Sequence, residues 1–126
     1  MIGIYIHQTA AAPYADDIAR RVKTIETRTR DMLGRLVGQR VLLIRTRDGH
    51  PADIVGSAVI ACKRWRTAAE LDAIRDRTRI PAGDRYDCKG LGKWCYDMAD
   101  AIRFDVPLPL SAFETGHRTR TYAEIK

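Results

Sequence analysis

Apolar residues recur along this chain in short segments whose spacing is typical of β-strands. Every second residue from Ile2 to Ile6 is isoleucine, and this period of two predicts a strand with one buried face. Similar segments, separated by turns that contain glycine or proline, predict further strands at 23–30, 39–46, 54–62, 94–104 and 119–125. The chain is therefore expected to fold around one sheet of five or six strands.

Two short helices are expected between these strands. Pro13 can open the first, in which Ile18 and Val22 lie four residues apart and face the core. The second follows the segment Thr67-Ala-Ala-Glu70, which has the pattern of a capping box. Helices inserted early and in mid-chain predict an α+β fold, either a curved sheet or a small, partly closed β-barrel with two or three short helices.

Two segments between the strands are predicted to be irregular. The sequence Asp-Gly-His-Pro at 48–51 indicates a turn, which we expect to belong to a longer loop of a β-hairpin. Residues 78–93 show little periodicity, contain several glycines and basic residues, and are expected to form a mobile loop that carries Tyr86.

The length of 126 residues suits a single domain, 1–126, with one hydrophobic core. The longest apolar runs, at 41–44 and 58–62, are far shorter than the roughly 18 residues that span a bilayer. The first residues have no basic flank of the kind that signal peptides carry, so we expect a cytoplasmic protein that is not bound to a membrane. Its three cysteines have no C-x-x-C spacing, and we expect them to be reduced thiols: Cys62, Cys88 and Cys95.

The positive charge of the chain is concentrated in one stretch. The formal net charge is +6, and residues 20–47 hold nine basic side chains against only Glu26 and Asp31. Arginine, which forms bidentate contacts with phosphate, supplies 17 of the 22 basic residues. This distribution favours a surface that binds anions, although a solvated basic surface has the same composition.

The segment Lys23-Thr-Ile-Glu26-Thr-Arg28 follows the first predicted helix and precedes a strand that begins Gly-Gln-Arg-Val at position 38. This arrangement resembles the ASCH domains of the PUA-like superfold, whose hallmark is G-x-K-x-x-E-x-R followed by a G-x-x-V strand. The segment Ile-Val-Gly-Ser-Ala-Val at 54–59 and the late strand with its prolines at 107 and 109 resemble further parts of that family. Arg21 departs from the pattern, because it occupies the motif's glycine position.

The resemblance implies a PUA-like β-barrel with a cleft that binds RNA, nucleotides or modified bases. Some ASCH relatives are enzymes, including ribonucleases and amidohydrolases that act on N4-acetylcytidine. The amidohydrolases carry a threonine, their proposed nucleophile, where this chain has Glu26, so their mechanism does not transfer directly to it. The expected partner is RNA or a modified nucleoside.

Three charged residues of the motif support both a binding and a catalytic interpretation. Lys23 and Arg28 can hold a phosphate while Glu26 accepts a hydrogen bond from an exocyclic amine of a base. In a hydrolase, Glu26 would be the general base that activates water, and Lys23 and Arg28 would stabilise the developing negative charge. A purely structural interpretation is also open, in which Glu26 pairs with one of the two cations and closes an end of the barrel.

Aromatic residues near basic ones suggest where a base could stack. Tyr86, in the basic loop, is the candidate, whereas Trp94 and Tyr96 share a strand face and are expected in the core. No cysteine and histidine spacing matches a zinc signature, and no Walker or dinucleotide motif occurs, so neither metal nor cofactor is expected. His7, at the end of the first strand, is expected to be structural.

These observations favour a single ASCH-type domain that binds RNA or nucleotides in a basic cleft around Lys23, Glu26 and Arg28, with Tyr86 at its edge. The alternative is a hydrolase of RNA or of an N4-acylated cytidine, in which Lys23 and Glu26 are the catalytic residues. A regulatory protein without a polynucleotide ligand is a third option, because a fold does not determine a function.

Overall fold

The computed structural model describes all 126 residues and forms one sheet of seven strands. In chain order they are β1 (Ile2–His7), β2 (Ile25–Arg28), β3 (Arg40–Arg47), β4 (His50–Thr67), β5 (Gly92–Pro109), β6 (Thr115–Arg118) and β7 (Tyr122–Ile125). The order within the sheet is β2-β5-β4-β3-β1-β7-β6. Only β1 and β3 run parallel; every other neighbouring pair is antiparallel.

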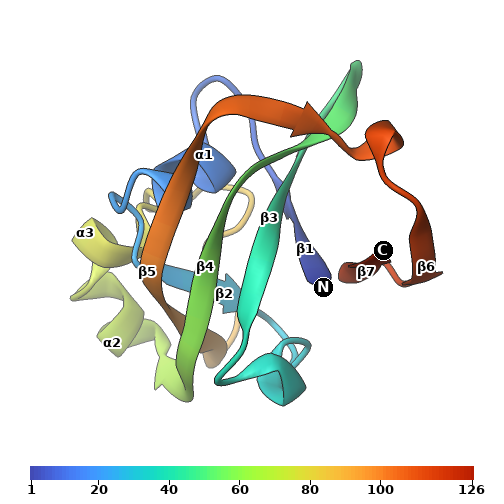
Figure 1. The fold of residues 1–126 in the computed structure, drawn as a ribbon. Helices are drawn as coiled ribbons and strands as arrows, with labels where there is room; N and C mark the ends of the chain where they lie inside the picture. Colours follow the sequence, from blue (N-terminus) through green and yellow to red (C-terminus); the bar gives the residue numbers. More distant parts are fainter.

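The sheet is strongly curved, and Figure 1 shows β2 crossing behind the long strands towards β1. The expected α+β architecture is confirmed, but the strand count of five or six is too low. The predicted β-barrel is not closed, because the two end strands β2 and β6 are not paired with each other. The additional strand comes from the C-terminal part, where β6 precedes β7. Its sequence, Thr-Gly-His-Arg, is half-buried to exposed and lacks the alternation that marks a strand.

Strands β4 and β5 are longer than their apolar segments indicate, with 18 residues each. Strand β4 begins at His50, which already pairs with Arg47, so the hairpin turn consists of Asp48 and Gly49 alone. The expected longer loop is therefore wrong. Gly49 has a φ of +75°, a conformation that short hairpin turns require and that glycine adopts without strain.

The helices are short and lie against the curved sheet (Figure 1). They are α1 (Tyr14–Ala19), α2 (Ala68–Asp72) and α3 (Arg75–Thr78), with 3₁₀ turns η1 (Gly34–Leu36) and η2 (Leu110–Ala112). The predicted capping box is present, because the Thr67 hydroxyl accepts from the Glu70 N–H and the Glu70 carboxylate accepts from the Thr67 N–H. None of these helices has the length and apolarity that a membrane crossing requires.

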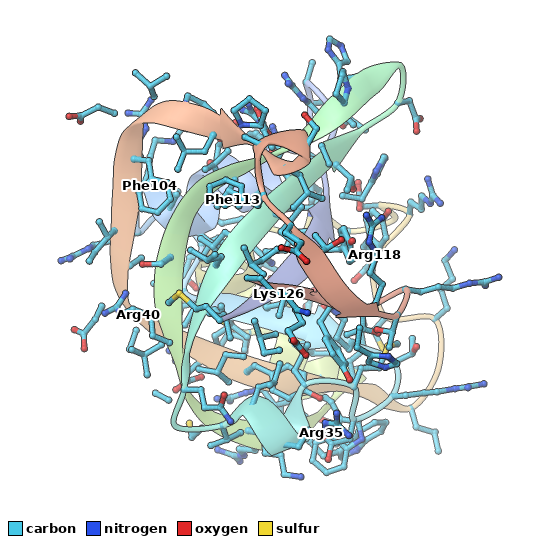
Figure 2. The ribbon with its side chains drawn as sticks, turned by 45° about the vertical axis from the view of Figure 1, so that its right-hand side comes forward. Arg35, Arg40, Phe104, Phe113, Arg118 and Lys126 are labelled. Carbon is cyan, nitrogen blue, oxygen red and sulfur yellow. The ribbon has the colours of Figure 1, made fainter.

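The main hydrophobic core lies between α1 and the sheet, with Ile18 of α1 completely buried. A second, smaller cluster surrounds Ile44 and Ile54, and Figure 2 shows Phe104 and Phe113, which pack against it, on the same side of β4. The two chain ends lie together (Figure 1), and the amino group of Met1 donates to the carbonyl of Ile125 at 2.9 Å.

Candidate functional site

A cavity of about 360 Å³ opens between β1 and β2, two strands of the curved sheet that are not paired with each other. Its walls come from segments far apart in the sequence, namely β1, α1, β2, the 79–91 loop, the start of β5 and the 119–121 turn. Lys23, Glu26, Arg28 and Tyr86, the four site residues that the sequence predicts, all line it. This volume lies within the range of pockets that hold a small ligand such as a nucleotide.

The end of α1 sets the position of Lys23. The Arg21 N–H donates to the carbonyl of Ile18 and the Val22 N–H to that of Asp17, which together form a Schellman motif. Arg21 occupies the position where this motif normally has glycine, and its φ is +66°. The site where the ASCH pattern has glycine thus has positive φ in this chain, at a cost of about 1 kcal/mol for a non-glycine residue.

Lys23 is almost completely buried, with 1% of its surface exposed. Its ammonium nitrogen donates to the carbonyl of Thr78 at the end of α3, lies 3.7 Å from Glu26 Oε1, and lies 4.9 Å from the centre of the Tyr14 ring. Burial lowers the pKa of Lys23, and the neighbouring Glu26 carboxylate counteracts this effect only in part. Lys23 therefore loses its proton more readily than an exposed lysine does.

Glu26 and Arg28 lie on β2, and Arg28 links this strand to β1, with which β2 is not paired. Arg28 Nη2 donates both to Glu26 Oε2 at 3.1 Å and to the carbonyl of Tyr5 on β1 at 2.9 Å. Burial raises the pKa of Glu26, but the positive charges of Arg28 and Lys23 outweigh it, and the net pKa lies below its ordinary value. The ion pair between Glu26 and Arg28 that the structural interpretation of the sequence requires is therefore present.

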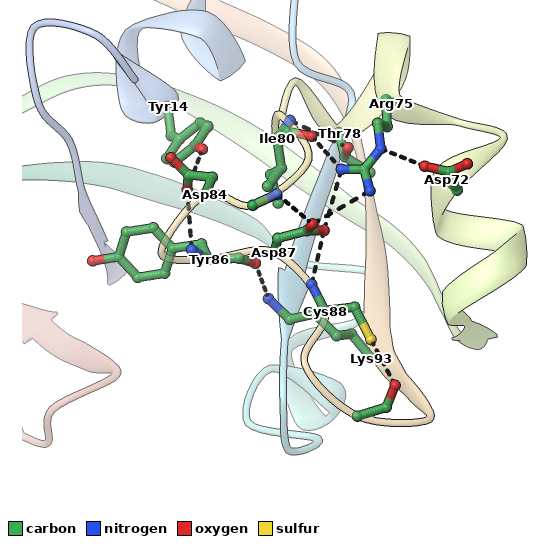
Figure 3. Close-up of polar contacts among 12 residues, drawn as sticks. Tyr14, Asp72, Arg75, Thr78, Ile80, Asp84, Tyr86, Asp87, Cys88 and Lys93 are labelled. Carbon is green, nitrogen blue, oxygen red and sulfur yellow. Dashed lines mark hydrogen bonds and ion pairs between the residues drawn. The ribbon is translucent and has the colours of Figure 1, made fainter.

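Tyr14 and Tyr86 form an aromatic wall of the cavity, with ring centres 6.0 Å apart and an edge-to-face arrangement. Figure 3 shows how the loop that carries Tyr86 is held. The Tyr14 hydroxyl donates to Asp84 at 2.9 Å, and Arg75 of α3 pairs with Asp87 at 3.1 Å. The loop is irregular, as predicted, but these contacts anchor it at two points where the sequence indicated mobility.

Lys93, at the start of β5, also lines the cavity and is 5% exposed. Its ammonium nitrogen donates to the carbonyl of Tyr86 at 2.8 Å (Figure 3). Burial lowers the pKa of Lys93, and the Glu26 charge opposes this shift. The sequence did not distinguish Lys93 from the other basic residues near Tyr86, and it did not identify Tyr14, because no local pattern marks either as part of a site.

His7 lines the cavity as well, although the sequence favoured a structural role. Its Nδ1 lies 3.2 Å from the Thr46 hydroxyl, whereas its buried Nε2 has no hydrogen-bond partner.

Among the predicted core aromatics, Tyr96 is completely buried and Trp94 is half-buried against the exposed Trp65.

The basic residues of the stretch at 20–47 do not gather around the cavity. Of its nine basic residues, only Lys23 and Arg28 line the cavity. Arg20 pairs with Asp17, and Arg45 pairs with Asp16 and Asp53. The three cysteines are free thiols, and no group of three or more His, Cys, Asp or Glu side chains is arranged to hold a metal ion.

Comparisons with known proteins support the fold. No family model matches the sequence, and no curated protein matches it either. Among solved structures, ASCH from Zymomonas mobilis is similar, with 18% identity, a TM-score of 0.66, and coverage of 86% of this chain and 74% of that one. A serine-to-alanine variant of the same protein, ZmASCH, has a TM-score of 0.70 at 18% identity, over 98% of this chain and 88% of that one. The chain therefore has the fold of ASCH domain proteins, as its sequence motif predicts.

Proposed function

We propose that this protein binds RNA or a nucleotide and places one nucleotide in the cavity beside Lys23, Glu26 and Arg28. The observation that carries the proposal is the combination of an aromatic wall, Tyr14 and Tyr86, with buried cations in a cavity of about 360 Å³. A base can stack on an aromatic ring with a gain of about 1–3 kcal/mol, while cations contact phosphate. The ASCH fold is consistent with this proposal.

Glu26 and Arg28 have acceptors and donors that make no hydrogen bond within the protein, and these can recognise a base. Glu26 Oε1 accepts from the Thr27 N–H at 3.1 Å and Oε2 accepts from Arg28, which leaves each oxygen with a further lone pair. These lone pairs can accept hydrogen bonds from the exocyclic amine of a base. The Nε and Nη1 groups of Arg28 remain as donors, because its two hydrogen bonds both use Nη2.

A hydrolase is the second candidate, and the geometry of Lys23 and Glu26 favours it. The two groups lie 3.7 Å apart in a buried site, and the lowered pKa of Lys23 makes its unprotonated amine more available than that of an ordinary lysine. Glu26 has a lowered pKa and is the weaker base of the two. If the protein hydrolyses RNA or an N4-acylated cytidine, Lys23 is therefore the proton acceptor and Glu26 positions it, which reverses the assignment made from sequence.

Two measurements test these functions. Binding of labelled single-stranded RNA is measured between 50 and 400 mM salt, and we expect the logarithm of the affinity to fall steeply with the logarithm of salt concentration. A flat plot would exclude phosphate contacts and the RNA proposal with them. The same RNA and a panel of N4-acylated cytidines are then incubated with the protein, and products are identified by mass spectrometry.

The variants Glu26→Gln and Lys23→Met distinguish binding from catalysis, and Lys89→Met is the matched control because Lys89 is exposed on the adjacent loop. Products that disappear in both cavity variants but persist in Lys89→Met would establish a hydrolase. Products that persist in all three variants would come from elsewhere in the protein or from a contaminant. RNA binding without products would leave a binding protein.

A further inference from the structure

One buried cation in the cavity has no negative partner. Lys93 is 5% exposed, yet no carboxylate lies within ion-pair distance of its ammonium nitrogen. Its one hydrogen bond goes to the carbonyl of Tyr86, although an ammonium group can donate three. A buried charge without an opposite charge is costly, so its retention beside an open cavity requires an explanation.

The whole cavity repeats this imbalance. Its lining contains four basic residues, Lys23, Arg28, Lys93 and Arg120, but Glu26 is the only acidic one. The negative charge of Glu26 is already balanced, because Glu26 pairs with Arg28 at 3.1 Å and lies 3.7 Å from Lys23. The charges of Lys93 and of Arg120 at the cavity rim therefore remain uncompensated.

We propose that Lys93, together with Lys23, forms a subsite inside the cavity for an oxyanion, which in a nucleotide is a phosphate group. This inference deepens the proposed function, on which it rests: the phosphate enters the cavity beside Lys93, and the base faces the aromatic wall. The substrate class becomes a nucleoside monophosphate or a terminal phosphate of RNA, in preference to a neutral nucleoside.

The surroundings of Lys93 suit an oxyanion. Glu26 and Arg28 face it from β2, Lys23 from the segment before β2, and Cys88 and Cys95 from the loop and its own strand. Burial lowers the pKa values of both lysines, and an incoming anion would favour their charged forms. Binding of an oxyanion is thus expected to favour proton uptake by these lysines, whereas binding of a neutral nucleoside is not.

Isothermal titration calorimetry tests this subsite. The probes are the four ribonucleosides, their 3′- and 5′-monophosphates, and inorganic phosphate, each titrated at pH 8 in two buffers with different ionisation enthalpies. In the unmodified protein, we expect at least one monophosphate to bind about 30-fold more tightly than its nucleoside and with proton uptake. In Lys93→Met this preference falls below about threefold, whereas Lys89→Met retains it. Lys93→Gln repeats the test if the methionine variant does not fold.

The outcomes separate the two proposals. Nucleosides that bind as tightly as their monophosphates, or a phosphate preference that survives in Lys93→Met, would overturn the subsite while leaving the nucleotide site in place. Inorganic phosphate that binds only when Lys93 is present, with no binding of nucleosides or nucleotides, would support the subsite and refute the nucleotide function. Failure of every probe to bind would overturn both.

Discussion

Two groups of charged residues in this small fold differ in the balance of positive and negative charge. In the first, Arg45 pairs with Asp16 and Asp53, Arg47 approaches Asp53, and Gln8 donates to Asp16. These two cations and two carboxylates neutralise each other and join β3, β4 and α1. The second group surrounds the cavity, and there the cations outnumber the single carboxylate, Glu26.

The difference in charge balance indicates a different role for each group. In a charge network that only stabilises the fold, every buried charge is expected to have a partner, because an unpaired buried charge costs free energy. A binding site leaves charges uncompensated, since the ligand supplies the missing partner. The Arg45 group is therefore interpreted as structural, and the cavity group as the place where an anion binds.

The largest expected effect comes from breaking the balanced group. Arg45→Met leaves Asp16 and Asp53 without their shared cation, and removal of one member of such a partly buried network is expected to lower the free energy of unfolding by about 3 kcal/mol. Thermal unfolding followed by circular dichroism should show a melting temperature lower by about 10 °C. Nucleotide affinity, measured well below that temperature, is expected to stay within twofold. A large loss of affinity in the folded variant would show that the two groups are coupled.

Glu26→Gln is expected to have the next largest effect, because it removes the only carboxylate of the cavity. The variant should lose about 2 kcal/mol at pH 7, since Arg28 and Lys23 lose their counter-charge. The folded-state pKa of Glu26 is lowered, so its stabilisation is present above the unfolded pKa near 4.5 and is lost as the pH falls through the folded pKa. Unfolding in urea at pH 7 and pH 3 should therefore show a smaller difference between the two proteins at pH 3.

The same variant also separates binding from chemistry. Removal of a negative charge makes the cavity more attractive to an anion, so Glu26→Gln is expected to bind inorganic phosphate several-fold more tightly than the unmodified protein. Calorimetric titration measures this directly. Unchanged phosphate affinity in a folded variant would place the anion outside the cavity.

The sequence predicts one side of this cavity but not the other. Lys23, Glu26 and Arg28 are recognisable because they are close in sequence, at a spacing typical of ASCH domains. Lys93 is not, because its neighbourhood resembles that of Lys89 only four residues earlier, yet Lys89 is exposed and Lys93 is buried. Their difference arises when β5 pairs with β2 and β4, a long-range event that no local pattern reports.

The fold shows the same division between local and long-range information. Alternating isoleucines predict β1, and the capping box at Thr67 predicts where α2 begins. Strand β6 and the outer parts of β4 and β5 have no such signal, since their residues are largely exposed and only pairing with a neighbouring strand makes them extended.

Lys93→Met is expected to stabilise the fold, in contrast to Arg45→Met. The pKa of Lys93 is lowered in the folded state, so keeping Lys93 charged costs free energy of folding. This cost is fully present below the folded pKa and is lost as the pH rises through the unfolded pKa near 10.5. Methionine has a similar shape without the charge, and we expect the variant to gain about 1–2 kcal/mol at pH 7. The gain should shrink as the pH rises towards 10, which urea unfolding at pH 7 and pH 10 can measure. A destabilised variant at pH 7 would mean that Lys93 stabilises the fold and is not an unpaired charge that a ligand completes.

The smallest expected effect concerns Arg21, which belongs to neither group. It donates through Nε to the carbonyl of Ala101 at 2.9 Å, and it has the positive φ that the Schellman motif requires. Arg21→Ala and Arg21→Gly both remove the hydrogen bond, but only glycine also relieves the backbone strain, so the glycine variant is expected to be more stable by about 1 kcal/mol, or roughly 4 °C in melting temperature. Equal melting temperatures would show that this turn carries no strain. Because the turn sets the position of Lys23, two residues later, a phosphate affinity that differs between the two folded variants would show that the helix end, and not only the charges around the cavity, determines how the anion is held.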